Sequence, residues 1–335
     1  ASAGQHLFAG LHDEGLVSSA DGGQTWASEP GLAARAVTRL ALGPAGRLFA
    51  WGPWERVWCS ADRGETWAPI QGLDESSALL ALASSVSEQR PCLLVGTTGG
   101  LQQSNDGGQT WRQALAAGVT SIVFSPQFDE DGRIWVGTDS GELLVSQDGA
   151  LDWTHLAPPQ PGVPLVALAV RPGRSSAEIL LAATLEISER RVNVWRSSDG
   201  GQTWEPWMQE AVDWPSVHLV LSGQTPGRAV VCIDRICWQA VPPDWQPARC
   251  VETDRPIVRM SQATEPPEIV LLAPGQMLCS GDGLSWSALD GGLGDWDWVD
   301  VNLAPCTASH HIAYALSRGG VVWCRTIPKG PYRLE

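Results

Sequence analysis

The sequence has only one lysine, no basic cluster and no long apolar stretch. Of its 335 residues, 22 are Lys or Arg and 37 are Asp or Glu, which gives a formal net charge of −15. An acidic surface repels phosphates and anionic lipid headgroups, so we expect no nucleic-acid partner. No segment reaches the roughly 18 to 20 apolar residues that a helix needs to cross a bilayer, so we expect no membrane insertion.

Motifs that bind metals or cofactors are also missing. The eight cysteines show no CxxC spacing and have no histidine partner nearby, so we expect no zinc site, no other metal and no cofactor. We favour small buried thiols over disulfides, although Cys232 and Cys237 could bridge across a hairpin if the protein is exported. The chain begins at Ala1 without a methionine, which fits either initiator removal or a cleaved leader. We give a slight preference to the cytoplasm over export.

Tryptophan, in contrast, is abundant: the sequence contains 18 Trp, but only 4 Phe and 2 Tyr. The excess comes from a repeated motif, Ser-x-Asp-x-Gly-x-Thr-Trp, whose tryptophans recur every 41 to 51 residues. This spacing is typical of a four-stranded propeller blade. The copies, the sixth of them degenerate, lie near residues 19–26, 60–67, 104–111, 146–153, 197–204, 243–245 and 280–286.

The motif is well suited to a tight turn between two strands. An aspartate accepts hydrogen bonds from backbone N–H groups of the turn, glycine adopts a positive φ, and tryptophan packs the turn onto a neighbouring sheet. We therefore expect a structural rather than a catalytic role for the motif aspartates, which are Asp21, Asp62, Asp106, Asp148, Asp199 and Asp282.

The segments between the motifs predict an all-β fold, a single β-propeller domain over residues 1–335 made of four-stranded blades. Seven apolar innermost strands are expected to start near Ala36, Ser77, Val119, Pro164, Ser216, Ile257 and Asp297. We expect seven blades, with eight as the alternative, and a ring closed by joining N- and C-terminal strands in one blade. The acidic residues Asp129, Glu130 and Asp131 stand where the repeat needs a turn, so we expect a solvated loop there rather than a calcium site.

The repeated motif resembles the Asp-box, or BNR, repeat of sialidases, sortilin-type receptors, xyloglucan-degrading hydrolases and photosystem II assembly and stability factors. The resemblance extends from Leu7 to about Arg325 and implies the propeller fold, while function depends on the loops. A sialidase of this superfamily needs an arginine triad and a tyrosine nucleophile with a glutamate partner. The only tyrosines here, Tyr314 and Tyr332, are not placed centrally with such a partner, so we lean toward a protein that is not an enzyme.

One set of charged residues lies in a common register of the expected inner strands. Arg39, His218, Arg259 and Asp300 align with one another, and the last three follow at steps of 41 residues. The two arginines could hold a small anion or a peptide carboxylate near the central channel, with His218 and Asp300 assisting. Alternatively, the four side chains form a charge-compensated ring with one another and with water, and we favour this alternative.

A second set of candidate binding residues is aromatic. Several tryptophans fall in or beside expected loops, where an exposed indole could anchor a protein partner or stack on sugar rings. Packing in the core is the alternative for each of them. These residues are Trp54, Trp207, Trp214, Trp296 and Trp298.

Two functions from different classes remain open after this reading of the sequence. We favour a non-catalytic scaffold, a protein-binding or assembly module that uses the loops on one face and the mouth of the channel. The alternative is a glycan-binding or glycoside-hydrolase-like protein, which the loop tryptophans and the hydrolase branch of the superfamily suggest. We expect another protein as the partner, with a glycan as the second possibility.

Overall fold

The structure is a computed structural model that describes most of the chain. It describes residues 7–11, 15–19, 27–29, 39–52, 56–62, 66–73, 76–85, 87–171, 178–213, 216–222, 227–242, 244–264, 267–273, 276–280, 285–288, 298–307, 310–317 and 322–328. In residues 7–11, 15–19, 27–29, 222, 262–264, 267–268, 298–300, 302–307, 310–317 and 322–328 the backbone alone is described. The described part contains no helix that is long and apolar enough to cross a membrane.

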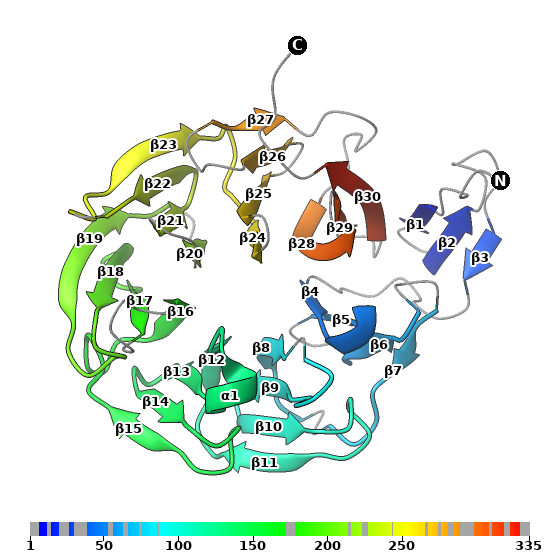
Figure 1. Ribbon diagram of the computed structural model, residues 1–335, viewed down its shortest axis with the longest axis horizontal. Helices are drawn as coiled ribbons and strands as arrows, with labels where there is room; N and C mark the ends of the chain where they lie inside the picture. Colours follow the sequence, from blue (N-terminus) through cyan, green and yellow to red (C-terminus); the bar gives the residue numbers. More distant parts are fainter. Residues whose placement is uncertain are drawn as a thin grey trace. The chain divides into compact units, whose positions relative to one another are not determined.

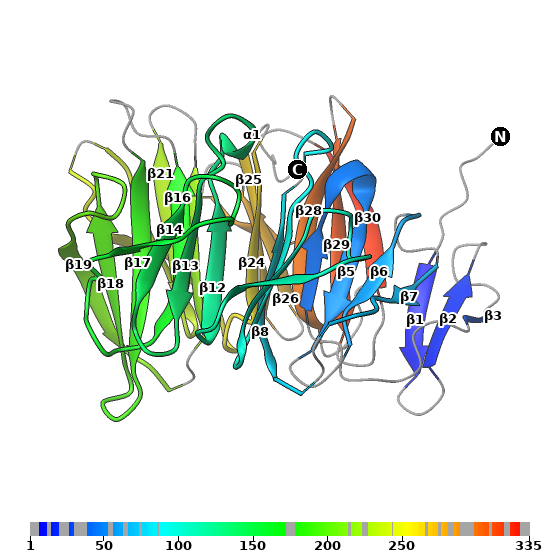
Figure 2. The ribbon, with the colours of Figure 1, turned by 90° about the horizontal axis from the view of Figure 1, so that it is seen from below.

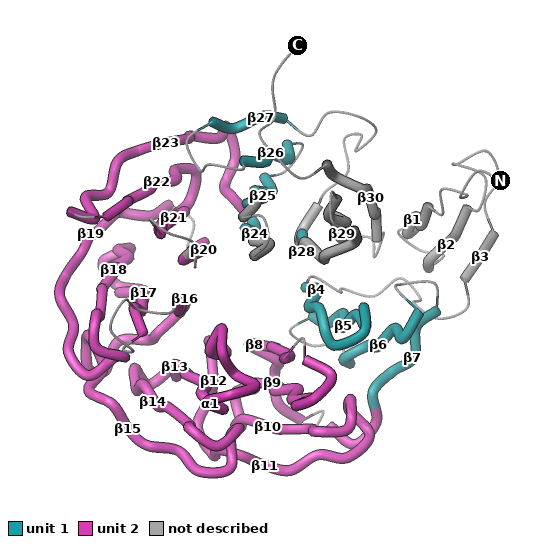
Figure 3. The backbone as a smooth tube through the Cα atoms, in the orientation of Figure 1, with its two compact units in different colours: residues 1–70, 258–335 teal, residues 71–257 magenta. Residues whose placement is uncertain are grey.

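The chain forms two compact units, which are described separately. One unit combines residues 1–70 with residues 258–335, and the other consists of residues 71–257 (Figure 3). Both are built from antiparallel sheets whose strands follow one another in sequence order.

The unit 71–257 contains four four-stranded sheets, here named blades A to D (Figure 1). Blade A consists of β8 (Leu79–Ser84), β9 (Leu93–Thr97), β10 (Gly100–Ser104) and β11 (Arg112–Leu115). Blade B consists of β12 (Val119–Phe124), β13 (Ile134–Thr138), β14 (Leu143–Ser146) and β15 (Thr154–Leu156). Blade C consists of β16 (Leu165–Arg171), β17 (Ile179–Glu186), β18 (Arg191–Ser197) and β19 (Glu205–Ala211). Blade D consists of β20 (Val217–Ser222), β21 (Arg228–Ile233), β22 (Ile236–Ala240) and β23 (Ala248–Glu252).

The first strands of these blades, β8, β12, β16 and β20, lie side by side in sequence order (Figure 1). Because the strands alternate in direction, the loop after the first strand and the loop after the third strand lie at one end of each blade. We call this the box end, since the Asp-box motifs occupy the loops after the third strands. The one-turn helix α1 (Phe128–Asp131) lies at the box end of blade B (Figure 2). The hairpins between second and third strands form the opposite end, here called the hairpin end.

The unit formed by residues 1–70 and 258–335 contains two four-stranded sheets and two three-stranded sheets. The first four-stranded sheet consists of β4 (Arg39–Leu42), β5 (Leu48–Trp51), β6 (Trp58–Ser60) and β7 (Ala68–Pro69), and the 3-10 helix η1 (Pro44–Gly46) follows β4. The second four-stranded sheet consists of β24 (Arg259–Thr264), β25 (Pro267–Ala273), β26 (Gln276–Ser280) and β27 (Ser287–Ala288). The three-stranded sheets are β1 (Leu7–Leu11), β2 (Gly15–Ser19) and β3 (Ala27–Glu29), and β28 (Trp298–Thr307), β29 (His310–Ser317) and β30 (Val322–Pro328).

The fold is an all-β propeller fold with six four-stranded blades, so the expectation of seven or eight blades is wrong. All seven expected inner strands exist and begin within three residues of the predicted positions. The error lies at the termini, where we expected the two ends of the chain to share one sheet. Instead, β1 pairs with β2 from Leu7↔Ser19 to Leu11↔Gly15, and β28 pairs with β29. Among the described strands, neither terminal set supplies a strand to the other sheet.

Burial explains why the second strands read as continuous apolar runs. Every residue of β9 and of β13 is buried, because both faces of these strands are covered by neighbouring sheets. The fourth strands lie at the outer edge and alternate between exposed and half-buried residues, as in β19. A single blade would leave both faces of its apolar strands in water, so the blades must stack in order to be stable.

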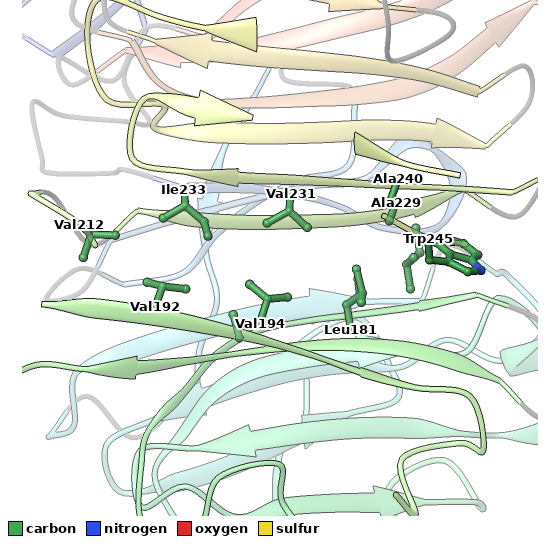
Figure 4. Close-up of a cluster of buried hydrophobic side chains, with 12 residues drawn as sticks. Leu181, Val192, Val194, Val212, Ala229, Val231, Ile233, Ala240 and Trp245 are labelled. Carbon is green, nitrogen blue, oxygen red and sulfur yellow. The ribbon is translucent and has the colours of Figure 1, made fainter. Parts of the chain in front are cut away.

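The interface between blades C and D shows this stacking clearly. Valine, leucine and isoleucine side chains from β17 and β18 meet those from β21 across the space between the two sheets (Figure 4). Val192, Val194 and Val231 have no exposed surface. Burial of one such side chain stabilises the fold by about 1.5–3 kcal/mol.

The Asp-box motifs of the unit 71–257 form tight turns that are held by the aspartate and the first serine. In blade A, Asp106 Oδ1 accepts hydrogen bonds from the backbone N–H groups of Gln109 and Thr110, both at 2.9 Å, and Oδ2 accepts one from Thr110 Oγ1 at 2.6 Å. Ser104 Oγ accepts a hydrogen bond from Gly108 N at 2.8 Å and donates one to Asp106 Oδ1 at 2.7 Å. Gly108 has a φ of 95°, which an L-residue rarely adopts.

The same carboxylate pattern is found at Asp62, Asp148 and Asp199, each of which accepts a backbone hydrogen bond from the residue four positions later. Asp21 and Asp282 lie outside the described residues.

The box turns also join each blade to the blade before it. The carbonyl oxygen of Gly149, in the box of blade B, accepts a hydrogen bond from Gln103 Nε2 of blade A at 2.7 Å. The next carbonyl, that of Ala150, accepts one from Arg112 of blade A. In blade C, the carbonyl of Gly200 accepts a hydrogen bond from Trp135 Nε1 of blade B at 3.3 Å. Thus the outward-facing peptide groups of a box turn are satisfied by the preceding sheet.

The box tryptophan supplies the reciprocal contact. Trp204 of blade C donates its indole N–H to the carbonyl of Ala157 at 3.1 Å, directly after the fourth strand of blade B. Its ring packs against a buried cluster that includes Leu143 of blade B. The bond and the packing both cross from one blade to the previous one.

The cysteines differ from the expectation at one pair. Cys232 and Cys237 form a disulfide, so the preference for reduced thiols is wrong for these two residues. They face each other in the ladder between β21 and β22, where directly opposite side chains are close enough to bond. Cys59 and Cys92 are free thiols.

We predict that Asp106→Ala destabilises the fold by about 1–2 kcal/mol, because four donors of the box turn lose a charged acceptor. Hydrogen bonds from the Thr110 hydroxyl, the Thr110 amide and the Ser104 hydroxyl hold the pKa of Asp106 well below its usual range. A carboxyl group with a lowered folded-state pKa stabilises the protein above its unfolded pKa of about 3.8, and this contribution is lost as the pH falls through the lower folded-state value. The stability difference between wild type and variant should therefore be full at pH 7 and shrink below about pH 4. Urea unfolding followed by tryptophan fluorescence measures it. Asp129→Ala, at an exposed position of α1, is the control and should change stability little.

We predict that Arg112→Ala destabilises the chain by about 1–3 kcal/mol, because it leaves the Ala150 carbonyl and the Gln103 side chain without their donor. The matched control is Arg249→Ala, which removes an exposed ion pair with Glu252 and should cost about 0–1 kcal/mol. Urea unfolding at pH 7 compares the two variants. Equal losses of stability would contradict the proposed joining role of Arg112.

Candidate functional site

The register of the inner strands is close to the sequence prediction. The ladders can be aligned on the last residue of each third strand, which pairs with a second-strand residue that in turn pairs with the first strand. Counted back three residues from that first-strand partner, the five sheets give Ser121, Ala167, His218, Arg259 and Arg39. In blade A this position is held by Ala81 rather than by Leu80. The β-bulge between Leu79 and Ala81 corresponds to the bulges between Val119 and Ser121 and between Leu165 and Ala167, so Leu80 corresponds to Thr120 rather than to Ser121.

The four charged residues of this register belong to both units. His218 lies in the unit 71–257, where its Nε2 is 3.3 Å from the carbonyl oxygen of Ile257. Arg39 and Arg259 open β4 and β24 in the other unit, and both are half-buried. Asp300 follows a bulge in β28, and its side chain lies outside the described part. An anion site formed by these residues stays a prediction.

Of the five candidate loop tryptophans, the structure describes the side chain of Trp207 alone. Trp207 lies within β19 rather than in a loop, and its Nε1 donates a hydrogen bond to the carbonyl of Trp245 at 2.6 Å. Its ring packs against the core between blades C and D. Trp54, Trp214 and Trp296 lie outside the described residues, as does the side chain of Trp298. A glycan-stacking role for them stays a prediction that a glycan array would test.

A cavity of about 240 Å³ opens at the box end between blades A and B. Its walls come from the loop between β8 and β9, from α1, and from the box turn of blade B. The lining residues are Gln89, Arg90, Pro91, Cys92, Asn105, Phe128, Asp148, Gly149 and Leu151.

Arg90 is fixed in the wall of this cavity by α1. Its guanidinium carbon lies 5.0 Å from the centroid of the Phe128 ring, and its Nη1 donates a hydrogen bond to the Phe128 carbonyl at 3.2 Å. Phe128 is itself buried and packs edge-on against Phe124, with 4.8 Å between the ring centroids. We expected only a solvated loop at Asp129–Asp131, but the one-turn helix here places the aromatic wall of the cavity.

Leu151 forms an apolar rim beside the same cavity. Its side chain is 61% exposed, which makes it one of the few large apolar residues that face solvent in the described part. The corresponding positions of the boxes in blades A and C carry Gln109 and Gln202. Our sequence analysis missed Leu151 as a candidate, although this departure from the motif was a usable signal.

The chemistry of the cavity favours binding over nucleophilic catalysis. Burial raises the pKa of the Cys92 thiol to about 11, so at neutral pH the sulfur is a protonated and weak nucleophile. The Asp148 carboxylate accepts the hydrogen bonds of its own box turn. Among the residues that the structure describes, no group of three or more His, Cys, Asp or Glu side chains is arranged to hold a metal ion. The cavity offers an apolar wall, one guanidinium and several amide groups.

Comparison with known proteins gives one family match. The sequence model of a family described as photosynthesis system II assembly factor YCF48 matches residues 60–236, more than half of the chain. A curated relative, the photosystem II assembly lipoprotein Ycf48 of Synechococcus sp. (strain CC9902), is 28% identical over 149 residues. That alignment covers 43% of this chain and 41% of the relative, so the matched segment spans less than half of the relative's length.

Solved structures with the same fold have lower sequence identity. A structure described as YCF48 bound to D1 peptide has a TM-score of 0.60 and 14% identity, and the match covers 89% of this chain and 95% of that one. YCF48 from Cyanidioschyzon merolae has a TM-score of 0.54 and 15% identity, with 87% and 97% coverage. The extracellular domain of a one-component system from B. thetaiotaomicron has a TM-score of 0.61 and 13% identity, with 94% and 39% coverage. At these identities the similarity shows the fold.

The slight preference for a cytoplasmic location is wrong on this comparison, because the curated relative is a lipoprotein, a class of exported and lipid-anchored proteins. The residues offered little to decide this question, since composition and surface charge do not differ reliably between the two compartments. The disulfide between Cys232 and Cys237 agrees with the correction, because such bonds persist in oxidising compartments.

Proposed function

We propose that this chain, which belongs to the photosynthesis system II assembly factor YCF48 family, is a non-catalytic assembly factor that binds a polypeptide segment of a photosystem II protein. The family match over residues 60–236 carries the proposal, because these residues include blades A, B and C and the start of blade D. The structure of a relative bound to a D1 peptide supports a peptide as the ligand. We therefore take D1 as the candidate partner.

The cavity at the box end between blades A and B is the candidate docking site for this segment. Leu151 presents exposed apolar surface at the rim, and the buried ring of Phe128 provides an apolar wall. Contact with Leu151 would remove apolar area from water at roughly 25 cal/mol per Å². Arg90 sits on the wall as a donor for a carboxylate or a backbone carbonyl of the peptide. A segment with an apolar side chain next to an acceptor group fits this surface.

The walls of the cavity are held in place before any ligand arrives. Gln103 bonds the carbonyl of Gly149, and Ser85 Oγ accepts a hydrogen bond from Cys92 N at 2.9 Å. Asp131 fastens the end of α1, since its two oxygens accept hydrogen bonds from Ser125 Oγ at 2.7 Å and from Arg133 N at 2.8 Å. A rigid site loses little conformational entropy on binding, which favours a measurable affinity for a short segment.

The test is a fluorescence anisotropy titration of the full chain with overlapping, fluorescein-labelled peptides that cover the D1 sequence. We expect at least one peptide to bind saturably, while a scrambled peptide of the same composition does not. Leu151→Gln should weaken binding about 5- to 30-fold, because it removes the apolar rim. This variant places at residue 151 the amino acid found in the boxes of blades A and C, so the turn should fold normally. Ile187→Gln, at another exposed apolar side chain of the same unit, is the matched control and should bind as wild type does.

Two results would count against this proposal. If no D1 peptide binds at protein concentrations up to about 100 μM, an affinity of roughly −5.5 kcal/mol or stronger is excluded and the D1 assignment fails. If a peptide binds but Leu151→Gln leaves its dissociation constant unchanged, the peptide lies elsewhere and the cavity at the box end is not the docking site.

A further inference from the structure

A second cavity, of about 350 Å³, opens at the hairpin end of the unit 71–257. It lies between the β17–β18 hairpin of blade C and the β21–β22 hairpin of blade D, so it is remote from the box turns. Its volume falls at the lower end of the range for sites that hold a small molecule or a single long side chain. The lining residues are Glu189, Arg190, Glu210, Ala211, Val212, Asp213, Ile233, Asp234, Arg235 and Ile236.

The charged groups of this cavity are not balanced. Four carboxylates line it against two guanidinium groups. The Asp213 carboxylate pairs with Arg190, whose Nη2 lies 3.5 Å from Oδ1 and also donates to the Asp213 backbone carbonyl at 2.7 Å, and Glu189 pairs with Arg191 at 2.6 Å. The carboxylates of Glu210 and Asp234 then remain, with Arg235 as the one opposing charge, and the Arg235 side chain is exposed.

Asp234 is the distinctive group of this site. Its Oδ1 is buried and accepts no hydrogen bond from the residues that the structure describes. A buried carboxylate oxygen without a donor costs free energy, so native proteins leave few such atoms unpaired. A cationic donor placed in the cavity would satisfy this oxygen and would also offset the excess negative charge.

Both hairpins that form the cavity are held in fixed conformations. Arg190 and Asp234 have φ values of 50° and 54°, a backbone conformation that residues other than glycine seldom adopt. The Arg190 carbonyl accepts a hydrogen bond from Val212 N at 2.8 Å, and Asp234 N donates to the Ser216 carbonyl at 3.0 Å. The Cys232–Cys237 disulfide links the two strands of the second hairpin at the pair next to Ile233↔Ile236, the pair that flanks the turn. The cavity is therefore preorganised, which lowers the entropy cost of binding.

The remaining surface of the cavity is aliphatic. Val212 and Ile233 are buried in its wall, where they can cover the methylene groups of a long side chain. Ile187, in the same turn as Arg190, is 71% exposed and extends the apolar surface beyond the cavity. Long basic side chains combine an aliphatic stem with a cationic head, and they match this arrangement.

We propose that the cavity at the hairpin end binds an arginine or lysine side chain of a partner polypeptide. The cationic head pairs with Asp234 and Glu210, the stem lies against Val212 and Ile233, and an aliphatic neighbour in the partner contacts Ile187. This site is separate from the cavity proposed above for a D1 segment, and it does not depend on D1 being the partner.

The probe is the blocked tripeptide acetyl-Leu-Arg-Leu-amide, titrated into the ¹⁵N-labelled full chain and followed by two-dimensional NMR. We expect saturable shifts of the backbone amides of Val212, Asp234 and Arg235. The same peptide with citrulline in place of arginine is a neutral isostere and should bind at least about fivefold more weakly, because it cannot form the ion pair. Equal binding of the two peptides would overturn the proposal, as would shifts that map to the cavity at the box end.

Variants of the two carboxylates test the assignment of the cationic head. Asp234→Asn keeps a side chain that tolerates the positive φ of the turn, and Glu210→Gln changes a strand residue without altering its size. Each should raise the dissociation constant of the arginine peptide about fivefold or more. Glu130→Gln, at an exposed acid of α1, should leave it unchanged. The proposal fails if both carboxylate variants bind as wild type does, or if calcium chloride alone produces the same saturable shifts, which would identify a cation site instead.

Discussion

The interaction on which the unit 71–257 depends is the joining of each Asp-box turn to the sheet before it. The aspartate collects the inward-facing amides of the turn, as Asp106 does, and this leaves the carbonyls at the tip of the turn pointing outward. The preceding blade then binds those carbonyls through Gln103 and Arg112 at one junction and through Trp135 at the next. Because the second strands are buried on both faces, a blade that lost this alignment would expose apolar surface on two sides. The turn therefore fixes how neighbouring sheets stack, in addition to reversing the chain.

The sequence predicted those parts of the fold that depend on local chemistry. The Asp-box motif requires particular residue types at particular places, so the turns and the seven inner strands could be located to within three residues. The errors lie where long-range pairing decides. The pairing of β1–β3 and of β28–β30 depends on which strands meet in space, and no local pattern encodes that choice. The disulfide likewise depends on a cross-strand pairing of Cys232 with Cys237 that only a register can supply.

The candidate sites were harder to predict than the fold, for a related reason. Each cavity lies between two blades and takes its walls from loops far apart in the sequence, such as those of Arg90 and Leu151 or of Arg190 and Asp234. The sequence prediction relied instead on residues that repeat in register, because a repeated pattern can be recognised in a single sequence. Repetition marks what every blade needs, and Trp207 illustrates the consequence, since a tryptophan that we assigned to a loop packs in the core. Binding surfaces come from what a single blade has and the others lack.

Departures from the repeat are therefore the more informative signal in this chain. The box of blade B carries Ala150 and Leu151 where blades A and C carry Gly-Gln, and this turn still holds its shape although Ala150 has a φ of 71°. A non-glycine residue in that conformation costs roughly 1 kcal/mol, and Ala150 is buried against the core of blades A and B. The neighbouring Leu151 has no such stabilising burial, since it faces solvent beside a cavity.

At blade D the motif is reduced further to Asp244-Trp245. The guanidinium carbons of Arg171 and Arg196, both of blade C, lie 5.4 and 5.3 Å from the centroid of the Trp245 ring. There the cations of the preceding blade contact the indole ring, and Trp207 of the same blade donates a hydrogen bond to the Trp245 carbonyl, so the junction between blades survives the loss of the motif. Because the junction tolerates such substitutions, the residues at the tips of the turns are free to vary, and Leu151, which we propose as part of a docking site, is the clearest departure from the motif.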